Sequence, residues 1–315
     1  MGNSLGIKEF EKQYKEHLSD YPNWEQKDHA DQYILFEKNI GEKLSIDETS
    51  VNNGELYTIL TNKKACGGKG SLVAMVKGIK PADIIAVLGK IPIEKRMSVV
   101  EVTLDMSNAM DVIIKKTFPK AIIVTDRFHV QQLVSEALQE VRIALRREAL
   151  KEEAEAILAA KEKKQTYKPK TYENTDTKKQ LLARSHYLLF KPENKWTESQ
   201  QERASIVFRE FPQIQHAYHV SMLFRSWYEH NRDKETARIN LQKWYRKIEE
   251  EQIASILVAA ASIKAHEDTI LNYFTNRSTN ASAESFNAKL KGFRALVRGV
   301  RDVKFFLFRL SKLYG

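Results

Sequence analysis

Cysteine is almost absent from this sequence of 315 residues, in which Cys66 is the only one. A single thiol cannot form an internal disulfide, and it cannot supply a cysteine-rich zinc module. Disulfide-stabilised secreted proteins are therefore excluded as a class, and the composition is typical of a reducing cytosol. We expect a cytoplasmic protein.

Long apolar runs are also missing. The longest, residues 256–263, is interrupted by Ser262 and is far too short to cross a bilayer. The first residues, MGNSLGIKEFEKQ, lack the apolar stretch of a secretory signal, so we expect no membrane association. Glycine and proline number only 12 and 7, too few for a low-complexity chain. The length suffices for a sizeable core with a second lobe.

Acidic residues are outnumbered, with 41 against 51 lysines and arginines, which gives a formal charge of +10. After Glu284 the imbalance is concentrated, with eight basic residues against the single acid Asp302. A polyanion would bind such a segment, because each phosphate that it neutralises releases counterions. A solvated basic helix face has the same composition, and charge alone leaves both interpretations open.

Short segments rich in β-forming residues begin after the first forty residues. Three of them follow one another: KLSIDET (43–49), ELYTILT (55–61) and SLVAMV (71–76). The first two flank Asn52-Asn53-Gly54, a sequence typical of a hairpin, so we predict three consecutive antiparallel strands. The CGGKG stretch (66–70) lacks the strand-to-helix context of a phosphate-binding loop, and we interpret it as the second hairpin turn.

Two helical stretches then alternate with two buried strands. The strands VVEVTL (99–104) and AIIVT (121–125) each run directly into an aspartate, Asp105 and Asp126. Ser107 is placed to cap the helix that follows the first of these strands. The order βββαβαβ predicts an α/β fold, a mixed five-stranded sheet flanked by helices.

Helical periodicity dominates the rest of the chain. The first forty residues predict two helices, and after the last strand no strand pattern recurs until about Tyr273. We predict four parts, in this order: an N-terminal helical segment (1–42), the first part of the sheet core (43–150), an all-helical insertion (151–273) and the last part of the core, with two helices (274–315).

Three acids stand out by position. Asp47 lies inside the first strand and Asp105 ends the fourth, while Glu284 lies at the edge of the apolar stripe of a helix over residues 281–291. A charged side chain in a buried strand is costly unless it is paired or binds a metal. If the three converge, they form an oxygen-only site that suits Mg²⁺ or Mn²⁺ rather than zinc. Two such ions, about 3.5–4 Å apart, can hold the attacking and leaving oxygens of phosphoryl transfer.

Each of these acids also has a purely structural interpretation. Asp47 could bond backbone amides near a turn, Asp105 could cap the following helix, and Glu284 could be an ordinary exposed helix acid. Glu48 is left out of the candidate site, because strand alternation points it to the opposite sheet face from Asp47.

Several stretches carry a resemblance to a known family. They are IDE (46–48), LDMS (104–107), FPKA (118–121), DRFHV (126–130) and a tail of the form TN-x-x-AE-x-x-N-x-K-x-K followed by Gly292 and Phe293. Together they resemble the bacterial insertion-sequence transposases of the ISL-three group, which have an RNase H-like DDE catalytic core with a helical insertion. The resemblance covers roughly residues 43–310, and its specificity comes from DRFHV and the tail taken together.

The resemblance implies a metal-dependent enzyme that cleaves DNA strands and transfers the ends of an insertion sequence to target DNA. It implies that Asp47, Asp105 and Glu284 are the catalytic and metal-binding triad, with two Mg²⁺ or Mn²⁺ ions as cofactors. Asp126 and His129 match an accessory D-x-x-H element. The DNA-binding residues that it implies are Lys289, Lys291, Arg294, Arg298, Arg301, Asn280 and Asn287. The expected location is the bacterial cytoplasm, near the nucleoid.

The sequence departs from the family at its N-terminus. Full-length members carry a cysteine-rich zinc element and a helix-turn-helix, and neither is found before the first strand here. Either a separate polypeptide recognises the DNA ends, or the chain is a truncated remnant. A homo-oligomer is expected by analogy, because two ends join in one event. Two alternatives stay open: an RNase H-like nuclease or resolvase without strand transfer, and a non-catalytic DNA-binding descendant of a transposase.

Overall fold

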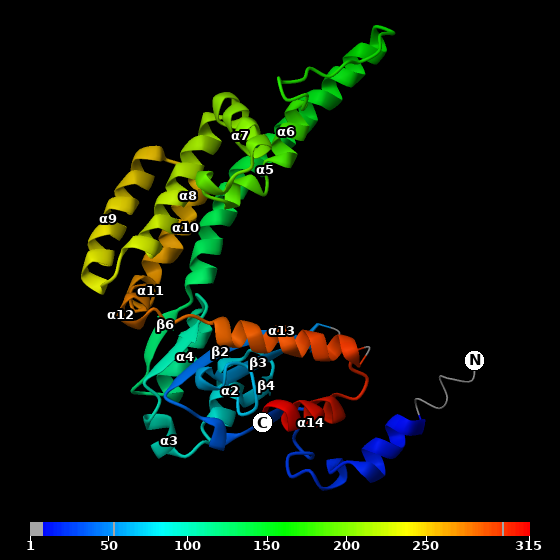
Figure 1. The fold of residues 1–315 in the computed structure, drawn as a ribbon, viewed down its shortest axis with the longest axis vertical. Helices are drawn as coiled ribbons and strands as arrows, with labels where there is room; N and C mark the ends of the chain where they lie inside the picture. The colour runs from blue at the N-terminus through cyan, green and yellow to red at the C-terminus, as the bar shows by residue number, and fades with distance from the viewer. Residues whose placement is uncertain (1–8, 53, 298) are drawn as a thin grey trace. The chain divides into compact units, whose positions relative to one another are not determined.

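The structure is a computed structural model that describes residues 9–52, 54–297 and 299–315. The chain forms two compact units, one from Met1–Asp126 with Asn276–Gly315 and the other from Arg127–Thr275 (Figure 1). The sequence ranges assign residues 127–150 to the sheet core. In the structure they belong to the second unit, because they are part of one continuous helix, α5 (Arg127–Glu162).

A six-stranded mixed sheet lies in the first unit, with the order β1-β4-β3-β2-β5-β6. Its strands are β1 (Tyr33–Leu35), β2 (Lys43–Asn52), β3 (Glu55–Asn62), β4 (Leu72–Lys77), β5 (Glu101–Leu104) and β6 (Ile122–Thr125). The first four strands pair antiparallel, whereas β2 with β5 and β5 with β6 pair in parallel. The predicted α/β class and its mixed sheet are confirmed.

The N-terminal segment departs from the prediction. Helical turns cover residues 9–18, but the second predicted helix does not form, and the chain makes the edge strand β1 instead. Within residues 9–42 the structure thus has a strand where the sequence predicts helix, and the sheet has six strands instead of the predicted five. Strand β1 has only three residues, too few to show a period of two in the sequence. It forms because Ile34 is fully buried against the sheet and β4 offers backbone partners.

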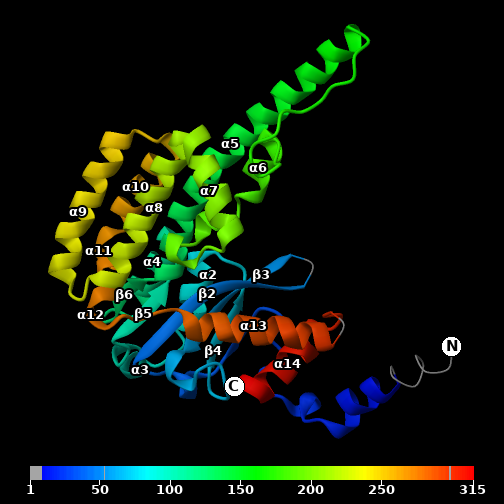
Figure 2. The same ribbon diagram turned by 45° about the horizontal axis from the view of Figure 1, so that its top comes forward.

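Alternation along the strands separates two apolar cores, one on each face of the sheet. The helices of this unit are α2 (Pro81–Leu88), α3 (Ile93–Met97), α4 (Asn108–Thr117), α13 (Ala281–Leu296) and α14 (Val303–Tyr314). One face packs on α2 and α4 through residues that include Ile46 and Leu104. The other packs on α13 and α14 through residues that include Tyr57 and Ile59. Figure 2 shows α13 lying across this second face.

The second unit is a set of helices around an aromatic core. After α5 come α6 (Lys178–Arg184), α7 (Glu198–Glu210), α8 (Pro212–His230), α9 (Lys234–Glu251), α10 (Ala254–Ala265), α11 (Glu267–Leu271) and α12 (Tyr273–Asn276). Trp227, Tyr228 and Trp244 are buried in this core. Across the described ranges, no helix has both the length and the apolarity that crossing a bilayer requires.

Candidate active site

Three aspartates lie on neighbouring parallel strands, Asp47 inside β2 and Asp105 and Asp126 directly after β5 and β6. Strand β2 pairs with β5 so that Ser45 lies opposite Thr103, and β5 pairs with β6 so that Leu104 lies opposite Thr125. Continuing both registers brings the backbones of Asp47, Asp105 and Asp126 to one line across the sheet. The amide of Asp126 still donates to the Leu104 carbonyl at 2.7 Å, so the alignment persists past the ends of the strands.

Helix α13 contacts two of these aspartates from the opposite side. The Asn280 backbone N–H donates to Asp126 Oδ1 at 3.2 Å, and the Asn287 side-chain amide donates to Asp47 Oδ2 at 2.7 Å. Two turns after Asn287, Arg294 donates to the Ser50 carbonyl at 3.3 Å. A single stripe of α13 thus runs from the residue after β6 to the second half of β2.

Glu284 is the one acid in α13 and lies on this stripe, between the two contacts. It comes four residues after Asn280 and three before Asn287, spacings at which side chains are neighbours on a helix surface. The rise along the axis is about 6 Å from Asn280 and about 4.5 Å to Asn287. Its side chain is exposed.

A closed metal cluster is not formed by these side chains. Within the part of the chain that the structure describes, no group of three or more His, Cys, Asp or Glu side chains could hold a metal ion. Asp47 Oδ2 accepts the Asn287 amide, and its Oδ1 accepts the Glu48 backbone N–H at 2.8 Å. The triad of Asp47, Asp105 and Glu284 therefore stays a prediction.

Glu48 lies close enough to Asp47 and Asp105 for their charges to act on its carboxyl. Burial, reinforced by the charges of Asp105 and Asp47, raises the pKa of the Glu48 carboxyl above its ordinary value. The sequence prediction left this residue out because of strand alternation. Alternation does not separate Glu48 from Asp105, because β5 has already ended at Leu104 and Asp105 no longer follows the pleat.

The two accessory residues differ in their settings. Asp126 is buried, with 1% of its surface exposed, and belongs to the sheet unit. His129 lies in the first turn of α5, in the helical unit, where its half-buried ring packs edge-on against Phe128 at 5.6 Å. The predicted D-x-x-H element is thus divided between the two units, and its role stays a prediction.

The predicted DNA-binding residues are spread over α13 and the segment after it. Lys291 and Arg301 are exposed, whereas the side chain of Asn280 is buried. Lys289 lies on the opposite flank of α13 from Asn287 and donates to the Gly67 carbonyl at 2.7 Å. Arg298 lies outside the described residues. The structure therefore brings Asn280 and Asn287 to the aspartates and directs Lys289 to the turn between β3 and β4.

Comparison with known families decides what this arrangement belongs to. A family model described as Transposase, that of the ISL-three DDE group, matches residues 44–310, which is most of the chain. The chain belongs to this transposase family. Comparison with the curated proteins and with the solved structures gives no match. Family membership makes the protein a DNA-processing enzyme, and its mixed sheet with a helical insertion is the RNase H-like transposase fold.

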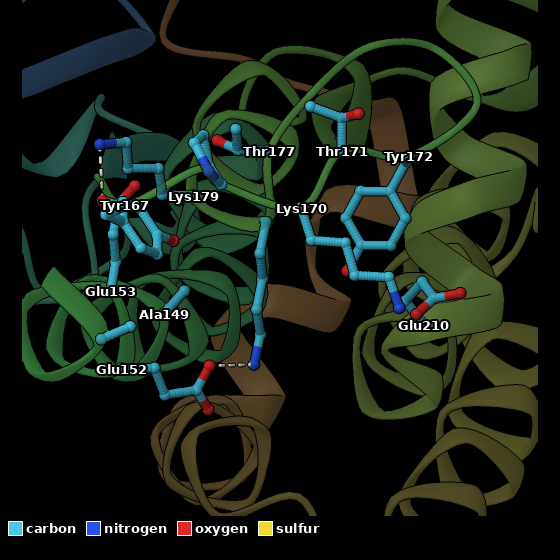
Figure 3. A pocket seen from close by; sticks show the side chains of 13 residues that line it. Ala149, Glu152, Glu153, Tyr167, Lys170, Thr171, Tyr172, Thr177, Lys179 and Glu210 are labelled. Carbon is cyan, nitrogen blue, oxygen red and sulfur yellow. Dashed lines mark hydrogen bonds and ion pairs between the residues drawn. The ribbon is translucent and has the colours of Figure 1, made fainter. Parts of the chain in front are cut away.

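A cavity of about 300 Å³ in the helical unit of the transposase is separate from the predicted catalytic residues. It lies between α5 and the segment that returns along it, and Figure 3 shows Tyr167, Lys170 and Tyr172 around it. Its two acids on α5 are neutralised: Glu152 pairs with Lys178 and Glu153 with Lys179, each at 2.6 Å. The pairing leaves no free carboxylate of α5 in this cavity for metal chemistry.

Proposed function

We propose that this transposase cleaves DNA strands at the ends of an insertion sequence and transfers the freed 3′-hydroxyl ends to target DNA, with divalent metal as cofactor. Family membership supports the assignment of the chain as a transposase. The observation that carries the finer one is the parallel register that aligns Asp47 with Asp105, together with the contact of α13 to Asp47. The register and the contact support the proposal that Asp47 and Asp105 act together with Glu284 of α13.

The donor chemistry of this edge fits a hard divalent cation. Asp47 and Asp105 are half-buried and Glu284 is exposed, and all three offer carboxylate oxygen, the ligand that Mg²⁺ and Mn²⁺ prefer. Asp47 and Asp105 would hold the metal from the sheet, and Glu284 would hold it from α13. When bound, the metal supplies Lewis acidity for in-line displacement at phosphorus.

Other side chains of this edge would orient the carboxylates and the DNA. Asn287 holds one oxygen of Asp47 through its amide, which limits rotation of that carboxylate. Asp126 would act through Asn280, whose backbone it binds, and so would fix the start of α13. The exposed cations Lys291 and Arg301 would neutralise phosphates of the DNA backbone.

Isosteric substitutions test the triad directly. Asp47→Asn and Glu284→Gln should each abolish Mg²⁺-dependent strand cleavage of a DNA end substrate while DNA affinity changes little. Glu55→Gln is the matched control, because Glu55 lies on the same sheet in an exposed ion pair with Lys77. Cleavage that survives in either triad variant, measured on purified protein, would contradict the assignment of that residue.

A strand-transfer assay separates the proposed function from a nuclease. A supplied DNA end with a free 3′-hydroxyl should be joined to a target duplex in the presence of Mg²⁺. Cleavage without joined product would instead assign the chain to RNase H-like nucleases or resolvases. DNA binding with steep salt dependence but no turnover would identify a non-catalytic descendant.

A further inference from the structure

A buried carboxylate outside the predicted triad lies at the start of β5. The side chain of Glu101 is 4% exposed and pairs with Lys63 Nζ at 3.3 Å. Lys63 is largely buried as well and donates to the Thr103 hydroxyl at 2.8 Å. Burying two opposite charges costs solvation energy that their attraction often only offsets. The pair is therefore weak as a source of stability, and its position requires another explanation.

Glu101 also binds the segment through which the chain re-enters the sheet unit after the helical insertion. Its carboxylate accepts hydrogen bonds from the Asn276 side-chain amide and from the Ser278 hydroxyl. The same Ser278 oxygen accepts from the Lys63 ammonium, and the Ser278 backbone N–H donates to Asn276 Oδ1 at 3.1 Å. Two residues of this short segment are thus held by Glu101, which also pairs with the half-exposed Lys43 at 3.6 Å, and by its buried partner Lys63.

The acceptor is suited to these partners because an ionised carboxylate only accepts hydrogen bonds. Burial alone would raise the pKa of Glu101, but the hydrogen bonds from Ser278 and Asn276, with the attraction of Lys63, outweigh it and lower the pKa. Glu101 is therefore ionised at neutral pH, as the contacts require. A glutamine at position 101 would instead place its own N–H donors against the Asn276 amide and the Ser278 hydroxyl, which are themselves donors.

The anchored segment leads directly into α13. Two residues after Ser278, the Asn280 backbone binds Asp126 at the end of β6, and α13 begins at the next residue. The entry to the helix is thus fixed at both ends of the parallel strands, by Glu101 at the start of β5 and by Asp126 after β6. The carboxylate of Glu284 lies one turn further along.

We propose that Glu101, held by Lys63, is the positioning residue that seats the first turn of α13 and thereby sets where Glu284 lies relative to Asp47. The proposal rests on the proposed function for its catalytic meaning, but the seating itself is a property of the fold. Without the anchor, the entry segment loses its side-chain bonds to β5 and the start of α13 opens more often. Its apolar stripe, farther along the helix, stays packed through Phe286 and Leu290.

Hydrogen exchange on the whole chain measures this seating without requiring activity. In Glu101→Gln, amides of residues 278–284 should exchange at least about tenfold faster than in the wild type. Ser278→Ala, which keeps the ion pair, should accelerate the same amides by a smaller factor. Amides of α2 and α4 should be unchanged in both variants, and Glu55→Gln, which breaks an exposed pair with Lys77, should change neither region.

Activity supplies the second readout. Glu101→Gln should raise the Mg²⁺ concentration for half-maximal cleavage and lower the cleavage rate, while DNA affinity is unchanged. Unchanged exchange at residues 278–284 overturns the proposal, and so does equal acceleration in α2 and α4, since Glu101 would then support the fold as a whole. If Glu101→Gln does not fold, the exchange of Ser278→Ala decides alone. If the wild type cleaves no DNA, the proposed function fails, while exchange still decides the seating.

Discussion

Asn287 donates its side-chain amide to Asp47 although the two residues are separated by 240 positions in the chain. The contact joins α13 to β2 at Asp47, the residue at which β2 changes from buried to acidic residues. Asp47 lies between the buried Ile46 and the exposed Glu48, so its carboxylate is at the boundary of the core. A hydrogen bond there selects one orientation of the carboxylate, as outer partners of metal ligands do in known sites.

Replacement of Asn287 tests this orienting role. Asn287→Ala should lower the rate of Mg²⁺-dependent cleavage about ten- to hundredfold, the usual cost of losing an outer partner of a metal ligand. DNA affinity should stay the same, because the phosphate-binding cations are intact. Ser285→Ala, on the other flank of α13, is the matched control. An unchanged cleavage rate in Asn287→Ala would show that the Asp47 carboxylate does not need this hydrogen bond for its orientation.

Helix α13 is held on its second flank by the turn between β3 and β4. Lys289 donates to the Gly67 carbonyl, and Gly67 has a positive φ of 72°. A Cβ on Gly67 would lie 3.0 Å from Ser285 Oγ and 3.3 Å from Lys289 Nζ. The turn therefore needs glycine for its backbone conformation and for the close approach of α13.

Two glycine substitutions in this region should have opposite effects on stability. Gly67→Ala should lower the free energy of unfolding by about 1–2 kcal/mol, because alanine is strained in the left-handed region. Gly292→Ala should raise it by about 0.5–1 kcal/mol, because Gly292 is inside α13 and a Cβ there meets nothing within 4 Å. Urea denaturation of both variants in parallel measures the difference, and effects of the same sign would contradict this view of the turn.

Asp302 caps the N-terminus of α14 and joins this helix to the N-terminal segment. Its side chain accepts from the Phe305 backbone N–H at 3.0 Å and pairs with Lys15 at 2.5 Å. Burial alone would raise the pKa of Asp302, but these hydrogen bonds outweigh it and hold the pKa below its ordinary value. The ionised form is thus favoured by folding.

Removal of this cap should destabilise the protein in a pH-dependent way. Asp302→Ala should cost about 1 kcal/mol near neutral pH, a typical value for an N-cap. Because the folded pKa is lowered, this stabilisation is present above the unfolded pKa, about 3.9, and is lost as the pH falls through the folded pKa. Urea denaturation at about pH 6 and about pH 3 checks both points.

A second aspartate provides the control for the cap. Asp20 also joins the N-terminal segment to α14, through an ion pair with Lys312 at 2.7 Å, but its side chain is 81% exposed. Asp20→Ala should therefore cost less than about 0.5 kcal/mol, as exposed pairs do. Equal losses in Asp20→Ala and Asp302→Ala would mean that surface charge, rather than the cap, is responsible.

At the scale of the whole molecule, positive charge concentrates in the last tenth of the chain, on α13, α14 and the link between them. In the sequence, the entire helical insertion separates this basic segment from the strands of the sheet. The basic segment nevertheless folds as part of the sheet unit. The catalytic candidates and the basic segment therefore belong to the same unit. DNA bound by these cations, as we propose, would lie on the unit that carries Asp47 and Glu284.

Salt dependence should report the phosphate contacts of this segment. Replacing Lys291 and Arg301 together by glutamine should reduce the slope of log affinity against log salt by about two, with weaker binding to all sequences alike. Replacing Lys77 and Lys95 is the matched control, because both are in ion pairs on the same unit. A slope that is the same in the double variant and the wild type would exclude these residues from the DNA interface.

The sequence by itself determined the local structure and the residue types of the site. Hairpin turns, alternation and capping act within a few residues, so β2 to β6 and α4 with its Ser107 cap could be predicted from neighbouring positions. The strand-end positions of Asp105 and Asp126 were readable for the same reason. Strand β1 was not, because three residues carry no period and its formation depends on the distant β4.

Only the tertiary structure decided which of these residues meet. The register of β2, β5 and β6 places Asp47, Asp105 and Asp126 on one line, and a slip of one residue would turn each side chain to the other face. The rotation of α13 about its axis selects Asn287 for Asp47 and sends Lys289 to Gly67. Long-range packing sets both the strand register and the rotation of α13, because local propensity does not determine which face of a helix packs on which strand.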